Sequence, residues 1–145
     1  MPEKGSRGRR EVPGGRPYPG RMRSFPVLAA LLADLVCVLV FVVVGKADHG
    51  TGTAFGAVLS TAWPFVAGAL LGWAATRAWR APAALWPTGV FVWAVTVVGG
   101  MLARRAVGEG TPLSFVIVTS LFLAAAMLGW RAVALLVAKR RQRAA

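Results

Sequence analysis

The sequence has very few of the residues on which metal sites and nucleophilic catalysis depend. It contains one cysteine, Cys37, and one histidine, His49. A single cysteine excludes an intramolecular disulfide and a cysteine-based zinc site, and one histidine beside one aspartate supplies too few ligands for structural zinc. We interpret Cys37 as an apolar packing residue and His49 as a solvated loop residue. No nucleophile–base–acid set, phosphate loop or haem pair is visible in the sequence, so we expect no enzyme activity, no metal and no cofactor.

Acidic residues are also scarce, with 5 Asp and Glu against 17 Lys and Arg, which gives a net charge of +12 at pH 7. A basic balance can indicate nucleic-acid binding. Here, however, almost all basic residues lie outside the apolar stretches, and most of them lie near the two ends of the chain. This pattern is typical of membrane proteins, whose flanking cations set helix orientation and contact anionic lipid. We therefore expect the lipid bilayer and its anionic headgroups as partners, and no nucleic acid.

Long apolar stretches dominate the rest of the 145 residues, of which 57% are hydrophobic. Four stretches, at about 25–45, 54–76, 83–103 and 113–138, each contain about 20 residues or more. At about 1.5 Å per residue, such a helix crosses a hydrocarbon core of roughly 30 Å. The sequence therefore predicts an all-α integral membrane protein with four transmembrane helices.

The connections between these stretches are short and contain Gly or Pro, so consecutive helices should lie antiparallel in an up-down-up-down bundle. Residues 1–24 are rich in Gly, Pro and basic residues and should form a disordered tail. Residues 139–145 should form a second, shorter basic tail. Leu-Gly-Trp occurs at 71–73 and at 128–130, and Gly-X-Gly-Thr occurs at 50–53 and at 108–111. This spacing suggests two repeated helical hairpins, although an Ala- and Gly-rich chain also produces such matches by chance.

The basic residues predict the orientation of the helices. Thirteen of them lie in segments that share one side after an even number of crossings: Lys4, Arg7, Arg9, Arg10, Arg16, Arg21, Arg23, Arg77, Arg80, Lys139, Arg140, Arg141 and Arg143. The other side has only three: Lys46, Arg104 and Arg105. Cytoplasmic segments carry the excess of Lys and Arg, so both termini should be cytoplasmic. Trp73, Trp79, Trp86 and Trp130 lie near the same boundary, as an interfacial aromatic belt would.

Two charged residues fall inside the apolar stretches. Asp34 lies about nine residues, or roughly 14 Å, from the cytoplasmic edge of its helix. A charge there costs at least about 2.5–3.5 kcal/mol on insertion scales, so it should face the interior and have a partner. Arg131 lies at a similar depth and is the candidate partner in an intramembrane charge pair. The alternative is that Arg131 extends along the helix until its charge reaches the headgroups.

Hydroxyl side chains on three helices share a second depth, near the opposite surface. They are Ser60, Thr61, Thr96, Thr119 and Ser120. They could form a polar layer that lines an outward-facing cavity. The simpler interpretation is that each hydroxyl donates to the carbonyl four residues earlier in its own helix. Pro64 lacks a backbone N–H and should kink the second helix near this layer.

Small residues recur at helical spacing and predict close helix packing. Gly68 and Gly72 form a GxxxG motif on the second stretch, and Gly100 belongs to a stripe of small and polar residues on the third. Such residues let helix backbones approach one another in a membrane. We expect these glycines to face neighbouring helices.

Several local strings together resemble a family of small actinobacterial membrane proteins, domain of unknown function 3054 (DUF3054). They are Asp34, Gly45-Lys46 with His49, Thr61-Ala62-Trp63-Pro64-Phe65, Gly72-Trp73, Trp93 with Thr96 and Gly100-Met101, and Gly129-Trp130-Arg131. The resemblance covers about residues 25–135 and leaves out both basic tails. It implies a multi-pass protein of a bacterial inner (plasma) membrane, and it implies no activity.

These observations leave three hypotheses for the function. The chain could be a structural or accessory membrane protein whose internal charge pair fixes helix register. It could instead be a small transporter or channel that uses Asp34 as a protonatable site, which would require a homodimer because four helices make a thin wall. A lipid-binding or lipid-modifying role is the third. Access of water to Asp34 would favour transport, whereas a dry and fully paired Asp34 would favour a structural role.

Overall fold

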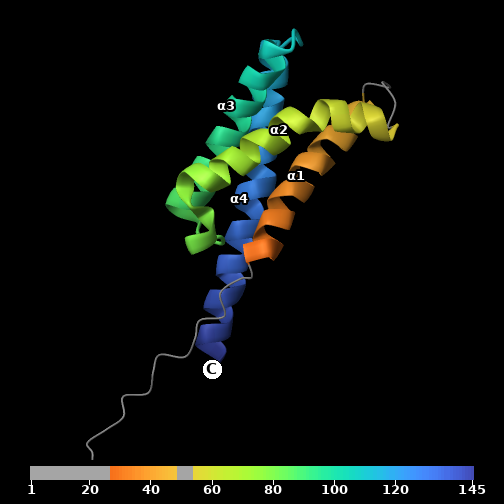
Figure 1. Ribbon diagram of the computed structural model, residues 1–145. Helices are drawn as coiled ribbons and strands as arrows, with labels where there is room; N and C mark the ends of the chain where they lie inside the picture. Colours follow the sequence, from red (N-terminus) through yellow and green to blue (C-terminus); the bar gives the residue numbers. More distant parts are fainter. Residues whose placement is uncertain (1–26, 49–53) are drawn as a thin grey trace, which may run out of the picture.

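The computed structural model describes residues 27–48 and 54–145, and this part of the chain is helical with no strand (Figure 1). The four long helices are α1 (Val27–Asp48), α2 (Phe55–Thr76), α3 (Val90–Ala106) and α4 (Leu113–Ala144). Two short turns, η1 (Ala78–Arg80) and η2 (Leu85–Gly89), connect α2 to α3. The predicted tail at 1–24, the Gly-Thr-Gly-Thr string at 50–53 and His49 lie outside the described residues.

The third helix begins later than the apolar stretch predicts. Regular α-helix starts at Val90 rather than near residue 83, because Trp86 has an extended backbone with φ −119° and ψ 138°. Trp86 precedes Pro87, and the proline ring disfavours the α conformation in the residue before it. The segment between α2 and α3 is therefore a bent connection, and its backbone carbonyls lie near the beginning of α3.

The fourth helix continues beyond the predicted end near residue 138. It runs without interruption to Ala144 and therefore includes the basic residues that the sequence places in a tail. Figure 1 shows this end of α4 extending past the other three helices. Lys and Arg near a helix C-terminus interact favourably with its exposed carbonyl groups, so these residues stabilise the last turns.

Each of the four spans, counting η2 and α3 together, is long and apolar enough to cross a membrane. Their outward faces are apolar as well: Leu28, Leu32 and Val36 on α1 are 66%, 52% and 55% exposed. Residues four apart share one face of a helix, so these side chains form a continuous apolar stripe. A stripe of this kind belongs in hydrocarbon rather than in water. The structure thus confirms an all-α, multi-pass membrane protein.

The helices form a closed ring of antiparallel neighbours in chain order. α1 packs against α2 and α4, and α3 packs against the same two helices. The most extensive interface joins α2 to α3. An up-down-up-down bundle of this kind is what the short connections predict, and the structure confirms it.

Small residues explain why α2 and α3 pack so closely. A methyl group added at Gly68 would lie 2.8 Å from the carbonyl oxygen of Thr96, and one added at Gly72 would lie 3.1 Å from the Cα of Val92. A methyl group on Gly100 would overlap the ring of Phe65. All three glycines therefore face a neighbouring helix, as their spacing suggests.

Phenylalanines fill the centre of the bundle. Phe41 of α1 meets Phe65 of α2 edge-on at a centroid distance of 5.7 Å. It also contacts Phe122 and Phe115 of α4, at 5.6 Å and 6.2 Å. Such aromatic pairs add about 0.5–1.5 kcal/mol each beyond the area they bury. This aromatic cluster joins α1, α2 and α4.

Candidate functional site

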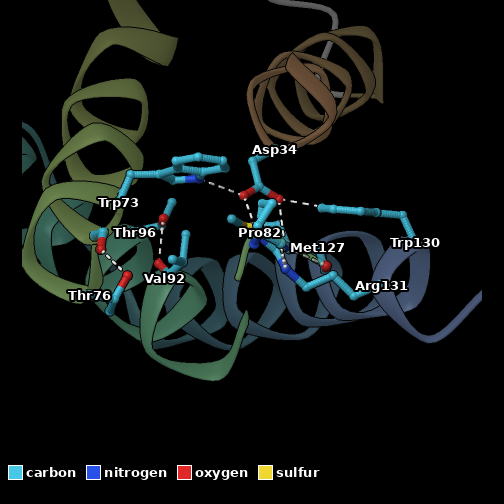
Figure 2. Close-up of polar contacts among 10 residues, drawn as sticks. Asp34, Trp73, Thr76, Pro82, Val92, Thr96, Met127, Trp130 and Arg131 are labelled. Carbon is cyan, nitrogen blue, oxygen red and sulfur yellow. Dashed lines mark hydrogen bonds and ion pairs between the residues drawn. The ribbon is translucent and has the colours of Figure 1, made fainter. Parts of the chain in front are cut away.

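One end of the bundle contains a buried cluster of charged and aromatic residues centred on Asp34. The Asp34 side chain projects from α1 toward α2 and α4, and the residue is 0% exposed (Figure 2). Periodicity places it on the inner face: Ala30 and Val38, four residues before and after it, are also fully buried. The cost of a charge in hydrocarbon predicts an interior position for Asp34, and the structure confirms it.

Arg131 of α4 pairs with this carboxylate in a two-pronged arrangement. Its Nη1 donates to Asp34 Oδ1 at 2.7 Å, and its Nη2 donates to Oδ2 at 2.6 Å. Both side chains are fully buried. Guanidinium and carboxylate groups match in this geometry, which gives direction as well as energy. The structure therefore brings the predicted charge pair together, and the alternative, in which Arg131 reaches the headgroups, is wrong.

Two tryptophans complete the coordination of the carboxylate. Trp73 of α2 donates its indole N–H to Oδ2 at 2.8 Å, and Trp130 of α4 donates to Oδ1 at 2.9 Å. An ionised carboxylate offers about four lone-pair sites, and here each oxygen accepts two hydrogen bonds. Figure 2 shows the two indoles approaching Asp34 from opposite sides, with Arg131 beneath. The anion is thus satisfied entirely by protein groups.

These two tryptophans correct the aromatic belt expected from the sequence. Trp73 is only 5% exposed, and Trp130 is half-buried. They lie inside because an indole N–H is a donor without an acceptor, which suits a buried carboxylate. Trp79 and Trp86 remain on the surface, 50% and 70% exposed. The signal that could have identified the inner pair is the Leu-Gly-Trp string that occurs twice.

N–H groups of the Arg131 guanidinium also donate to backbone carbonyls. Arg131 Nε donates to the carbonyl of Pro82 at 3.2 Å, and Nη1 donates to that of Met127 at 2.9 Å. The Arg131 guanidinium carbon also lies 4.4 Å from the centre of the Trp130 ring, in cation–π geometry. Pro82 belongs to the bent connection between α2 and α3, so Arg131 ties that connection to α4.

Gly89 makes room for the arginine. A methyl group added there would lie 2.7 Å from Arg131 Cδ and 3.1 Å from the carbonyl oxygen of Ala84. Ala84 O also accepts a hydrogen bond from the Gly89 N–H at 3.0 Å. Position 89 thus combines a tight turn with contact to a buried side chain. The sequence pattern gives no sign of this contact.

The cluster links every part of the bundle except the body of α3. Asp34 comes from α1, Trp73 from α2, Trp130 and Arg131 from α4, and Pro82 from the connection that leads into α3. Hydrogen bonds to charged groups contribute about 1.5–3 kcal/mol each. Removing one partner of a buried pair leaves the other uncompensated, at a cost of about 3–5 kcal/mol. The cluster therefore penalises any arrangement that separates α1 from α2 and α4.

The hydroxyls of the predicted polar layer donate mostly within their own helices. Thr61 and Ser60 both donate to the Ala57 carbonyl, at 3.1 Å and 3.0 Å. Thr96 donates to Val92 O and Ser120 to Val116 O, both at 2.7 Å. Ser60 is exposed, whereas Thr96 is fully buried, so these side chains do not face one common space. Four of the five hydroxyls thus bond within their own helix, as the simpler interpretation predicts, and of these four Thr61 also lines a cavity.

Thr119 and Pro64, in the same region, make no side-chain hydrogen bond within the described part of the chain. Thr119 is fully buried, and its hydroxyl has no hydrogen-bond partner within the described part of the chain. Pro64 is buried inside α2, which remains helical on both sides of it. The kink predicted at Pro64 stays a prediction.

Metal chemistry has little support in the described segments. In residues 27–48 and 54–145, no three His, Cys, Asp or Glu side chains gather closely enough to hold a metal ion. Cys37 is a free thiol, half-buried one turn from Asp34, and it packs against the apolar core.

Comparison with known proteins identifies a family for this chain and assigns it no activity. No curated protein and no solved structure matches the sequence. A family model described as a protein of unknown function, DUF3054, matches residues 31–134, which contain the whole of the Asp34 cluster. The match extends over most of the chain, and the chain therefore belongs to the DUF3054 family of proteins of unknown function.

Proposed function

We propose that this protein is a structural or accessory component of a bacterial inner membrane, with a buried ion pair that fixes the relative positions of its helices. One observation carries the proposal: Asp34 is fully buried, and both of its oxygens are occupied by donors from Arg131, Trp73 and Trp130. Asp34 is therefore fully paired and out of contact with water, which is the condition that favours a structural role over transport.

The rival function, transport by protonation of Asp34, lacks such support. A carboxylate that carries protons must exchange them with water during each cycle, and Asp34 has no exposed surface. Protonation would also convert one acceptor oxygen into a donor and thereby oppose at least one of the N–H groups that face it. The proposal accordingly includes no translocated substrate, no catalysis and no cofactor.

Orientation and partners complete the proposal. Thirteen basic residues on one side against three on the other support cytoplasmic N- and C-termini. In this orientation the basic end of α4 meets the anionic headgroups of the inner leaflet. Large exposed apolar side chains on the lipid-facing surface, such as Leu121 at 66%, leave room for a homodimer without requiring one.

A double-mutant cycle tests the structural role. Asp34→Asn and Arg131→Gln should each lower the free energy of unfolding in mild detergent by about 3–5 kcal/mol. The double variant should lose less than the sum, because the second change removes a charge that the first left unpaired. Unfolding by added dodecyl sulfate, followed by tryptophan fluorescence, measures all four proteins.

The matched control is the partly exposed pair Arg104–Glu109, at 2.7 Å, with side chains 13% and 40% exposed. Its coupling energy should be about 0–1 kcal/mol. Additive losses at Asp34 and Arg131 would show that the pair does not act as a unit. If Asp34→Asn leaves stability unchanged, the structural proposal fails and a titrating carboxylate becomes the better account.

A further inference from the structure

A cavity of about 570 Å³ lies at the opposite end of the bundle from the Asp34 cluster. Its apolar wall consists of Phe41 and Val42 from α1 and Phe115 and Val118 from α4. Small-molecule sites are concave, mostly apolar and about 300–1,000 Å³ in volume. The cavity has the size and the lining of such a site, and neither the ion pair nor the proposed structural role requires it.

Cationic groups lie at the end of this cavity. Lys46, in the last turn of α1, and Arg104, in the last turn of α3, both line it, together with Glu109. Glu109 pairs with Arg104 at 2.7 Å, whereas Lys46 has no ion pair with any carboxylate whose side chain the structure describes. Among these side chains the lining has two cations against one anion, and the remaining positive charge complements an anionic group.

Arg104 also has an unused donor. Its Nη1 binds Glu109, and its guanidinium carbon lies 4.7 Å from the centre of the Phe115 ring. Its Nε–H, in contrast, is buried and has no hydrogen-bond partner in the described part of the chain. A buried polar group without a partner costs about 1–3 kcal/mol, and charged groups cost more. The Arg104 guanidinium therefore keeps one hydrogen-bond donor that no group of the described residues uses.

The cavity is reached from the side, where lipid lies. Figure 1 shows α1 and α4 diverging toward the C-terminal end of α1. Both helices line the cavity, together with Thr61 of α2 and Arg104 of α3. Its base is closed, since Phe41 and Val42 are 6% and 2% exposed, but Val118 on its α4 wall is 59% exposed. Val118 lies about five residues, or roughly 8 Å, below the start of α4 and therefore within the hydrocarbon region. An acyl chain can enter here without leaving the membrane.

We propose that this cavity binds an anionic phospholipid from the bilayer, with one acyl chain against Phe41, Phe115 and Val118 and the headgroup phosphate beside Lys46 and Arg104. The net positive lining selects a lipid with net negative charge over one whose headgroup is zwitterionic. The site shares no residue with the Asp34 cluster, which lies nearer the other end of the bundle.

Native mass spectrometry of the whole protein tests this proposal. The protein is released from micelles that contain equal amounts of phosphatidylglycerol and phosphatidylcholine, and the bound lipid is identified by mass. Wild type should retain phosphatidylglycerol at least fivefold over phosphatidylcholine. Lys46→Gln and Arg104→Gln should each reduce this preference at least threefold. Arg105→Gln, which removes an exposed cation next to Arg104 that does not line the cavity, should leave it unchanged.

A second pair of variants tests the cavity itself while all charges stay in place. Val118→Trp should fill the cavity and abolish retention of phosphatidylglycerol. Ile117→Trp places the same side chain on the neighbouring, lipid-facing position and should retain it. Melting temperatures in phosphatidylcholine micelles show which variants fold. If Arg104→Gln does not fold, Lys46→Gln alone tests the role of the positive charge.

Four outcomes overturn the proposal. Equal retention of the two lipids by wild type removes the selectivity, and retention by Val118→Trp removes the site. If Lys46 and Arg104 act only on helix ends, their variants will melt earlier in both lipids and keep the lipid preference. A dimer mass that disappears with Val118→Trp would identify the occupant as a second copy of the chain.

Discussion

The α2–α3 interface permits the sharpest test of the packing, because one substitution should have opposite effects at two glycines. Gly68 and Gly129 both lie inside long helices. A methyl group at Gly68 would lie 2.8 Å from Thr96 O and 3.2 Å from the Gly100 nitrogen, both backbone atoms of α3. A methyl group at Gly129 would meet nothing within 4 Å. Gly68→Ala and Gly129→Ala are therefore the same chemical change in filled and in open space.

The expected magnitudes follow from two opposing effects. Alanine is favoured over glycine inside a helix by about 0.8–1.0 kcal/mol. At Gly129 nothing opposes this gain, so Gly129→Ala should stabilise the protein by up to about 1 kcal/mol. At Gly68 the clash is with backbone, and relieving it requires α2 and α3 to move apart. Overpacking of this kind costs about 1–3 kcal/mol. A clash with backbone at 2.8 Å cannot be relieved by a side chain, so we expect the upper part of this range, about 2–3 kcal/mol, and a net destabilisation by Gly68→Ala of roughly 1–2 kcal/mol.

Reversible unfolding in dodecyl sulfate measures both variants on one scale. The two free energies should differ by about 2–3 kcal/mol, with opposite signs relative to wild type. Gly72→Ala should behave like Gly68→Ala, since its methyl group would lie 3.1 Å from Val92 Cα. If Gly68→Ala is as stable as Gly129→Ala, the two helix backbones do not touch at this position, and the account of the interface is refuted.

Two further predictions concern the charge cluster and the orientation. Trp73→Phe and Trp130→Phe each remove one N–H donor from Asp34 and should cost about 1.5–3 kcal/mol, whereas Trp79→Phe, at a 50% exposed side chain, should change stability by less than about 0.5 kcal/mol in the same unfolding assay. Equal effects at all three positions would contradict the hydrogen bonds to Asp34. Reporter fusions after Ala145 and after Asp48 should report opposite sides of the membrane, the former cytoplasmic, and a shared side for both would contradict an even number of crossings.

Much of the fold follows directly from the sequence, because the membrane imposes simple requirements. An apolar run of about 20 residues must be a helix, since unpaired backbone groups are too costly in hydrocarbon. Short connections then leave only antiparallel neighbours. The late start of α3 could also have been predicted, because Pro87 disfavours helix at Trp86. The continuation of α4 to Ala144 could not, since the terminal basic residues are good helix formers that do not themselves specify helix or tail.

The sequence predicts how deep the charged residues of the site lie in the membrane, but it does not predict their contacts. Helical rise places Asp34 and Arg131 at similar depths, and the insertion cost demands a partner for Asp34. Depth alone does not distinguish pairing from extension toward the headgroups, because an arginine can reach either. Arg131 faces inward because Gly89 leaves space for its side chain and Pro82 offers a carbonyl. Both come from a bent connection about 40–50 residues away in sequence, which periodicity does not describe.

The two ends of the bundle are mechanically related through α1. Asp34 fixes α1 to α2 and α4 at one level, and Lys46 lies twelve residues further along, or roughly 18 Å away. A rigid helix of that length that pivots by about 3° at Asp34 moves its far end by about 1 Å. Phe41 braces α1 between these points through contacts with Phe65 and Phe122, and beyond it the helix borders the cavity. Asp34 and Phe41 together therefore fix the angle of α1, and that angle sets the distance between α1 and α4 at the cavity.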